Sequence, residues 1–193
     1  HRSFAVVWTG AFISSIGVWV QSVAQSWLVL DLSGSAFYLG LDAFLAQLPI
    51  VLFTLIGGVM ADRYSRRTLL TLSQILQMCS ALTLAVLVFV GDVRIWHVLA
   101  LSFLTGTAQS FGGPAYQSLL PALVARRDLP TAIAFNSIQF SLARAIGPMV
   151  AGVTLAAFGS AACFGLNGAS YLAVIVALLT VRLPAHTPTP RQP

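Results

Sequence analysis

Few side chains in this sequence could do chemistry, and the clearest of them stands inside a long apolar segment. Arg144 follows Pro130 by fourteen residues in a stretch with no other charge, which in a helix places it about 21 Å from the start. Asn136 and Phe140 precede it at intervals of four residues, so all three share one helix face. A charge inside a membrane is costly unless it meets water or a partner. We therefore interpret Arg144 as facing a polar cavity, with a structural ion pair or a snorkelling side chain as alternatives.

A stripe of polar side chains marks the first apolar segment. Gln21 and Gln25 lie one turn apart, in line with Ser14 and next to Ser22. Polar side chains in a membrane helix point toward neighbouring helices rather than lipid. The stripe could line a substrate path together with Asn136, Gln139 and Arg144, or it could only bond adjacent helices. The sequence leaves both interpretations open.

Asp42 is the one acid that lies well inside an apolar segment, about two turns from its start. A carboxylate that can take up and release a proton within the membrane is what proton coupling requires. An acid near the outer surface can also be wetted by solvent, and this second interpretation is the one we favour from the sequence.

The composition limits what such residues can belong to. The chain has 193 residues, of which 58% are hydrophobic and 8% charged, whereas soluble domains are about 45–50% apolar and about 25% charged. This argues against a soluble enzyme, a nucleic-acid-binding domain and a disulfide scaffold. The sequence has no phosphate-binding loop, no Ser-His-Asp set and no His or Cys cluster with metal-ligand spacing. We expect neither an enzyme nor a cofactor or metal site.

Six apolar segments are each long enough to cross a bilayer, which takes about 20 residues. We therefore predict an all-α integral membrane protein, with residues 1–183 forming one bundle and 184–193 a disordered tail or the start of an interdomain linker. The predicted transmembrane helices cover residues 4–30, 36–61, 68–90, 95–124, 130–158 and 162–181.

The arginines alternate along these segments. Eight of the ten fall at the start, in the second–third and fourth–fifth connections, and in the tail, while only Arg94 falls in the opposite set of connections. Arginine-rich connections stay on the cytoplasmic side. Both termini are therefore expected to be cytoplasmic.

The second–third connection carries a glycine, an acid and three arginines in the order Gly58, Asp62, Arg63, Arg66 and Arg67. Their spacing and position resemble the loop motif of the major facilitator superfamily, although Ser65 replaces a glycine of that motif. The resemblance implies that Asp62 and its arginines form a cytoplasmic latch between the two halves of a transporter. A cluster of arginines that only sets topology is the alternative.

Two further segments resemble exporters of this superfamily. Gly147 and Pro148, with Gly152 beyond, are similar to a Gly-Pro motif in the fifth helix of exporters, where proline bends the helix; this favours export, and a kink used only for packing is the alternative. In drug-exporting members the fourth helix carries an arginine a few residues before a glycine. Aligning that glycine with Gly106 puts Ser102 at the arginine's position.

The segments around Phe111–Ala115, Leu120–Val124 and Asp31–Gly34 are similar to a bacterial branch of siderophore exporters and drug-efflux permeases. This resemblance implies the N-terminal half of a twelve-helix secondary transporter in the inner membrane, built as a three-plus-three inverted repeat. It would export a small organic solute by alternating access, driven by protons, with a C-terminal half or a second copy as its partner and no nucleic acid. A homodimerising half-size carrier and a nontransporting membrane scaffold are the alternatives.

Overall fold

The computed structural model describes residues 2–181, apart from the side chains of Arg2 and Asp62. Throughout this range the regular structure is helical, without strands, which agrees with the predicted all-α class. The predicted tail at 184–193 lies outside the described residues. The helices are α1 (Arg2–Ser33), α2 (Ala36–Arg63), α3 (Arg66–Val90), α4 (Ile95–Leu119) and α5 (Leu129–Thr180), with 3-10 turns η1 (Leu120–Leu123) and η2 (Arg126–Asp128) between α4 and α5.

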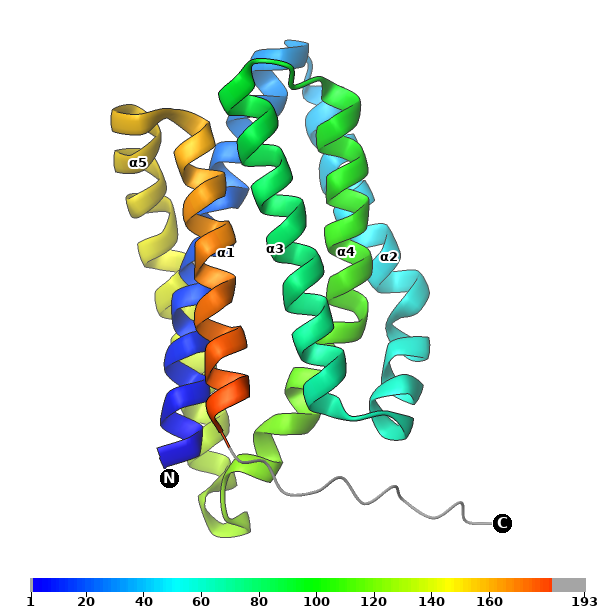
Figure 1. Cartoon of the computed structure of the whole chain (residues 1–193), viewed down its shortest axis with the longest axis vertical. Helices are drawn as coiled ribbons and strands as arrows, with labels where there is room; N and C mark the ends of the chain where they lie inside the picture. Colours follow the sequence, from blue (N-terminus) through cyan, green and yellow to red (C-terminus); the bar gives the residue numbers. More distant parts are fainter. Residues whose placement is uncertain (1, 182–193) are drawn as a thin grey trace.

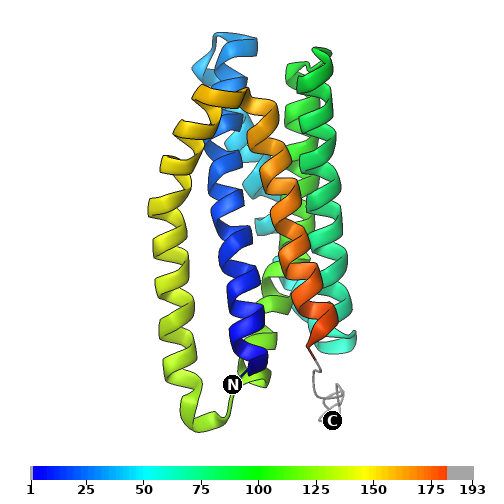
Figure 2. The same cartoon turned by 60° about the vertical axis from the view of Figure 1, so that its left-hand side comes forward.

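α5 is interrupted at Gly159, whose φ of 79° and ψ of 178° are not helical. Glycine adopts such a positive φ because it lacks a Cβ. Figures 1 and 2 show α5 running the length of the bundle, turning, and returning on the other side of α1. We call residues 129–158 the first arm of α5 and residues 160–180 its second arm. With the two arms counted separately, the described residues form six long helical segments, and their bounds lie close to those of the six predicted segments.

Four helices of the described chain are long and apolar enough to cross a membrane, namely α1, α2, α3 and α5 with both its arms. α4 has 25 residues but carries Ser102, Thr105 and Gln109, which lower its hydropathy. The fourth segment was expected to continue to Val124, but α4 ends at Leu119 and gives way to a 3-10 turn containing Pro121. Proline has no backbone N–H with which to extend the helix.

The helices pack in defined pairs. α1 packs mainly against α5, α2 against α4, and α3 against both α4 and α5. The N-terminus, the α2–α3 connection and the turns η1 and η2 lie at one end of the bundle (Figure 1). The α1–α2 and α3–α4 connections and the α5 break lie at the other end. Five arginines therefore share the end opposite to that of Arg94, as the alternation requires: Arg63, Arg66, Arg67, Arg126 and Arg127.

Polar side chains occupy the middle of the bundle, between two apolar clusters. On α3 they lie between Leu70 of one cluster and Leu84 of the other, and on the second arm of α5 they lie between Val174 and Phe164. We call this group the polar layer. Its buried members are Asp42, Ser73, Gln77, Ser80, Ser102, Asn167 and Ser170.

α2 and α4 approach closely at Gly106. A Cβ built on this glycine would clash with the backbone carbonyl oxygen of Ala46. Small residues allow this kind of contact between membrane helices. Because Gly106 is four residues from Ser102 and Ala46 is four residues from Asp42, the contact fixes the helices one turn away from these two side chains.

Gly106→Ala is expected to destabilise the protein by about 1–3 kcal/mol through overpacking against Ala46. Gly113→Ala is the matched control on the same helix, because the nearest atom to its added Cβ would be the Gln109 amide nitrogen at 3.9 Å. Thermal unfolding of the purified variants in detergent measures the difference. Equal unfolding midpoints for the two variants would contradict the close contact.

Candidate transport site

Asp42 of α2 lies inside the bundle and is only 7% exposed. The Ser102 hydroxyl donates to its Oδ1, and Gln25 Nε2 donates to its Oδ2 at 2.8 Å. Within the described residues no arginine or histidine forms an ion pair with it. The interpretation of Asp42 as an acid wetted from outside is therefore wrong, because α1 and α4 cover it with polar but uncharged groups.

The hydrogen bonds around Asp42 continue through α1 into the second arm of α5. Gln21 Nε2 donates to Gln25 Oε1 at 3.3 Å, and Asn167 Nδ2 donates to Gln21 Oε1 at 2.6 Å. Asn167 is 1% exposed. The polar stripe on α1 thus bonds neighbouring helices in the way that one of the two open interpretations proposed.

From Asn167 the chain of hydrogen bonds runs on to α3 and α4. Asn167 Nδ2 is 3.5 Å from the Tyr171 hydroxyl, which donates to Gln77 Oε1 at 3.3 Å. Gln77 Nε2 donates to Ser73 Oγ at 3.0 Å, and Ser73 donates to the Ala108 carbonyl at 2.7 Å. One connected path of hydrogen bonds therefore links α1, α2, α3, α4 and the second arm of α5.

Sequence reasoning missed Asn167, Tyr171, Gln77 and Ser73. A signal was present, because Asn167 and Tyr171, and likewise Ser73 and Gln77, are spaced by four residues in otherwise apolar segments. That spacing places each pair on one helix face, and polar faces of membrane helices meet other helices.

Arg144 lies on the exposed side of the first arm of α5, next to α1. Its guanidinium carbon is 5.7 Å from the centroid of the Trp19 ring, a cation–π distance. Trp19 meets Phe140 edge-on at 6.4 Å. The backbone at Gly147 leaves no room for a side chain, since a Cβ there would clash with Trp19 Cβ. The prediction that Arg144 and Phe140 share one helix face is confirmed, and no ion pair of Arg144 with an acid occurs among the described side chains.

Two other predicted cavity residues, Asn136 and Gln139, are less exposed than Arg144. Asn136 is partly buried and its Oδ1 accepts a hydrogen bond from the Tyr116 hydroxyl at 3.0 Å. Gln139 is only 3% exposed, and its Nε2 donates to Ser15 Oγ of α1 at 3.3 Å. In this structure Gln139 does not line an open face, and its role as a cavity residue stays a prediction. It is turned about 100° around the helix from Phe140, and this rotation brings it under α1.

The arginines of the loop motif bind the ends of neighbouring helices. Arg66 donates to the Ser118 carbonyl at 2.9 Å, in the last turn of α4, and Arg67 donates to the Leu179 carbonyl at 3.0 Å, in the last turn of α5. Carbonyls at a helix C-terminus lack intrahelical partners and carry partial negative charge. Arg63 is exposed. The Asp62 side chain lies outside the described part, so the latch stays a prediction.

The glycines near these motifs behave differently from one another. Gly57 packs against the Ser110 carbonyl, whereas a Cβ on Gly58 or Gly152 would meet nothing within 4 Å. A close approach between α2 and α4 therefore occurs at Gly57 and not at Gly58. α5 stays helical through Pro148 and its backbone breaks at Gly159.

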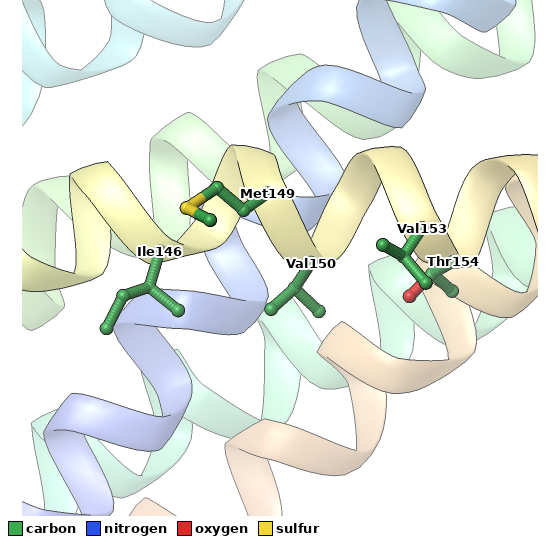
Figure 3. A pocket seen from close by; sticks show the side chains of 5 residues that line it. All are labelled: Ile146, Met149, Val150, Val153 and Thr154. Carbon is green, nitrogen blue, oxygen red and sulfur yellow. The ribbon is translucent and has the colours of Figure 1, made fainter.

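A shallow groove on the first arm of α5 is apolar (Figure 3). It contains none of the polar candidates, and its lining suits hydrocarbon. The groove is lined by Ile146, Met149, Val150, Val153 and Thr154.

Comparison with known proteins identifies the family of this chain. Residues 1–191 match the family model described as transmembrane secretion effector. The chain belongs to this family of the major facilitator superfamily. It is 30% identical over 193 residues to the enterobactin exporter EntS of Salmonella paratyphi A and covers 46% of that protein. It is 27% identical over 172 residues, or 89% of the chain, to the staphyloferrin A transporter of Staphylococcus aureus and covers 43% of it.

The chain therefore spans less than half the length of these relatives. The family is one of transporters rather than enzymes. The protein is a multi-pass protein of the bacterial inner membrane, and the apolar helices of the bundle suit that location.

Asn167→Ala is expected to destabilise the bundle by about 1–3 kcal/mol, because it removes the hydrogen bond that the buried Asn167 amide donates to Gln21 Oε1. Ser137→Ala is the control, since the Ser137 hydroxyl only bonds the Ile133 carbonyl of its own helix. Thermal unfolding in detergent compares the two variants. If Asn167→Ala unfolded at the wild-type temperature, the path through Asn167 would contribute nothing to stability.

Proposed function

We propose that this chain is the N-terminal six-helix half of a secondary transporter that exports a siderophore-like solute by alternating access, with both termini cytoplasmic. The family supports a transporter, and the relatives named for enterobactin and staphyloferrin A support a siderophore. The observation that carries the proposal is Arg144, a cation on the open face of a long apolar helix.

The solute side of the proposal rests on the surroundings of Arg144. A guanidinium deep in a membrane helix is costly against lipid, so the face that it shares with Trp19 and Phe140 is proposed to line the central cavity. A planar cation beside two aromatic rings suits an anionic or polar organic solute. Gln21 and Gln25 are partly exposed and complete the cavity candidates.

The driving force is proposed to act at Asp42. Its only described partners are neutral donors, so its charge is not cancelled by a cationic side chain. A buried acid of this kind is stabilised by taking up a cation, and a proton is the simplest one. Binding and release of a proton at Asp42 would then accompany the two access states.

The remaining half is proposed to supply the other wall of the cavity. The relatives are about twice as long as this chain, and Asp62 with Arg63 would contact that second half as a latch. Gly147, Pro148 and Gly152 would provide the bend that lets the first arm of α5 move.

The complete product of the gene that encodes this chain is expected to export siderophores from inverted vesicles only when a proton gradient is present. The 193-residue chain alone is expected to be inactive. Enterobactin, staphyloferrin A and a neutral drug form the solute panel. Transport by the chain alone would indicate a self-assembling half-size carrier, and no transport by either protein would favour a scaffold.

Arg144→Gln is expected to weaken the apparent affinity for an anionic solute by about tenfold or more, because it removes a charge-assisted contact. Arg144→Lys keeps the charge without the planar group, so its apparent affinity should fall between those of the wild type and Arg144→Gln. Arg94→Gln is the control for loss of an arginine, because Arg94 lies at the N-terminal end of α4 and outside the proposed cavity. Concentration dependence of export measures the effect, and an unchanged solute range in Arg144→Gln would refute the assignment.

Asp42→Asn is expected to abolish accumulation driven by the proton gradient while leaving solute exchange across the membrane intact. The amide mimics the protonated acid and can still bond Ser102 and Gln25, so the fold should persist. Counterflow and gradient-driven transport are measured in the same vesicles. Gradient-driven export at the wild-type level would remove Asp42 from the coupling step.

A further inference from the structure

A groove lies on the surface of the bundle where α3 begins and the second arm of α5 ends. Its volume is about 320 Å³, roughly ten times the ~30 Å³ that one water molecule takes in the liquid, so it can hold much more than a single ion. α3 and the second arm lie side by side there in both views of the bundle (Figures 1 and 2). The groove is lined by Arg67, Thr68, Thr71, Leu72, Ile75 and Leu179.

The lining of this groove changes from polar to apolar along the axis of α3. Arg67 and Thr68 lie in the first turn of the helix, and Ile75 lies about 12 Å further toward the middle of the bundle. Thr71 and Leu72 lie between these two ends. Because residues 67, 71 and 75 are spaced by four, they form one continuous strip on the helix surface. A cation and two hydroxyls at one end and aliphatic side chains at the other match a ligand that is itself amphiphilic.

The Arg67 side chain is held in place and still has donors to offer. One of its terminal nitrogens donates to the Leu179 carbonyl at 3.0 Å, which ties the side chain to the second arm of α5. A guanidinium carries several N–H donors, and among the described residues Arg67 makes no further hydrogen bond or ion pair. The remaining donors are available to a phosphate group, which a guanidinium binds through two parallel hydrogen bonds.

The end of the bundle that carries Arg67 has an excess of positive charge. Residues 62–67 and 126–128 together hold five arginines and two aspartates, and the first turn of α3 contains no acid. Basic pockets between helices at a membrane surface attract anionic headgroups. A lipid with a net negative headgroup is therefore favoured over a zwitterionic one.

From this arrangement we propose that the groove between α3 and the second arm of α5 binds one anionic phospholipid. Arg67 binds its phosphate, together with the hydroxyls of Thr68 and Thr71. The upper part of an acyl chain lies over Leu72 and Ile75. Phospholipid headgroups lie at the bilayer surface and their chains run toward its centre, which is the direction in which the lining becomes apolar. The lipid is separate from the exported solute, because the face proposed for the solute belongs to the first arm of α5.

A lipid in this groove joins two helices that are far apart in the chain. Arg67 already bonds α3 to the last turn of α5, and a phosphate on the same guanidinium holds that side chain in position. A ligand that binds only the folded state raises its stability by mass action. The unfolding temperature of the protein should therefore rise with the concentration of anionic lipid.

The test uses the complete product of the gene that encodes this chain, purified in detergent and stripped of lipid. Dioleoyl-phosphatidylglycerol, dioleoyl-phosphatidylcholine and inorganic phosphate are the probes, added at equal concentrations. Native mass spectrometry is expected to show saturable binding of phosphatidylglycerol, and thermal unfolding is expected to show a higher midpoint with this lipid alone. An equal rise with inorganic phosphate, or equal binding of the two lipids, would overturn the proposal.

Two pairs of variants separate the groove from general surface charge. Arg67→Gln is expected to weaken phosphatidylglycerol binding at this site by about tenfold or more, because the charge-assisted contact is lost. Arg127→Gln is its control, since Arg127 is an exposed arginine at the same end of the bundle and lies outside the groove. Ile75→Trp fills the apolar part of the groove and should also displace the lipid. Leu76→Trp is the control for it, because Ile75 and Leu76 are both 38% exposed and Leu76 does not line the groove.

Equal lipid binding by Arg67→Gln and Arg127→Gln would overturn the site, because surface charge alone would then account for the lipid. If Arg67→Gln fails to fold without its bond to Leu179, the comparison of Ile75→Trp with Leu76→Trp decides the question, and equal binding by these two variants overturns the site. Both measurements follow lipid binding and not transport. Failure of the lipid site would therefore leave the proposed export function standing, and absence of export would leave the lipid site standing.

Discussion

The interior of this bundle must satisfy its own polar groups, because hydrocarbon offers no hydrogen bonds from outside. Asp42, Gln25, Asn167 and Gln77 all lie in the polar layer, and each is bonded to a side chain from another helix. An unpaired polar group there would cost several kcal/mol. The requirement to pair these groups therefore fixes how the helices are rotated against one another, beyond what apolar packing alone would specify.

Close helix contacts make that pairing possible. The short side chain of Ser102 reaches Asp42 only because Gly106 lets the backbones of α2 and α4 approach each other. At the other contact, Gly147 lets α5 approach α1 and brings Trp19 to Arg144. At both contacts a glycine therefore lets two helices approach closely beside a polar or charged side chain that contacts the neighbouring helix.

The sequence was sufficient to predict the helical segments, but it was not sufficient to predict how each helix is rotated about its axis against its neighbours. Segment lengths and the arginine pattern predicted six helical segments and the alternation of their ends, and the Gly159–Ser160 break was among the predicted boundaries. The burial of Asp42 and of Gln139 was not predictable in this way. Whether a residue faces lipid, a cavity or a helix depends on contacts between segments far apart in the chain, such as Gln139 with Ser15, and a helical period cannot specify those contacts.

Buried Asp42 and exposed Arg144, the two charged groups within the long apolar segments, are joined through a single helix. Trp19, which contacts Arg144, and Gln25, which contacts Asp42, are both on α1 and are separated by six residues, or about 9 Å along the axis. Within the described chain α1 is also the helix most closely packed on α5. A displacement of α1 relative to α2 and α4 would change the surroundings of Asp42, and the same displacement would move Trp19 against Arg144. A change at either group can therefore reach the other through rigid motion of one helix, without any longer pathway between them.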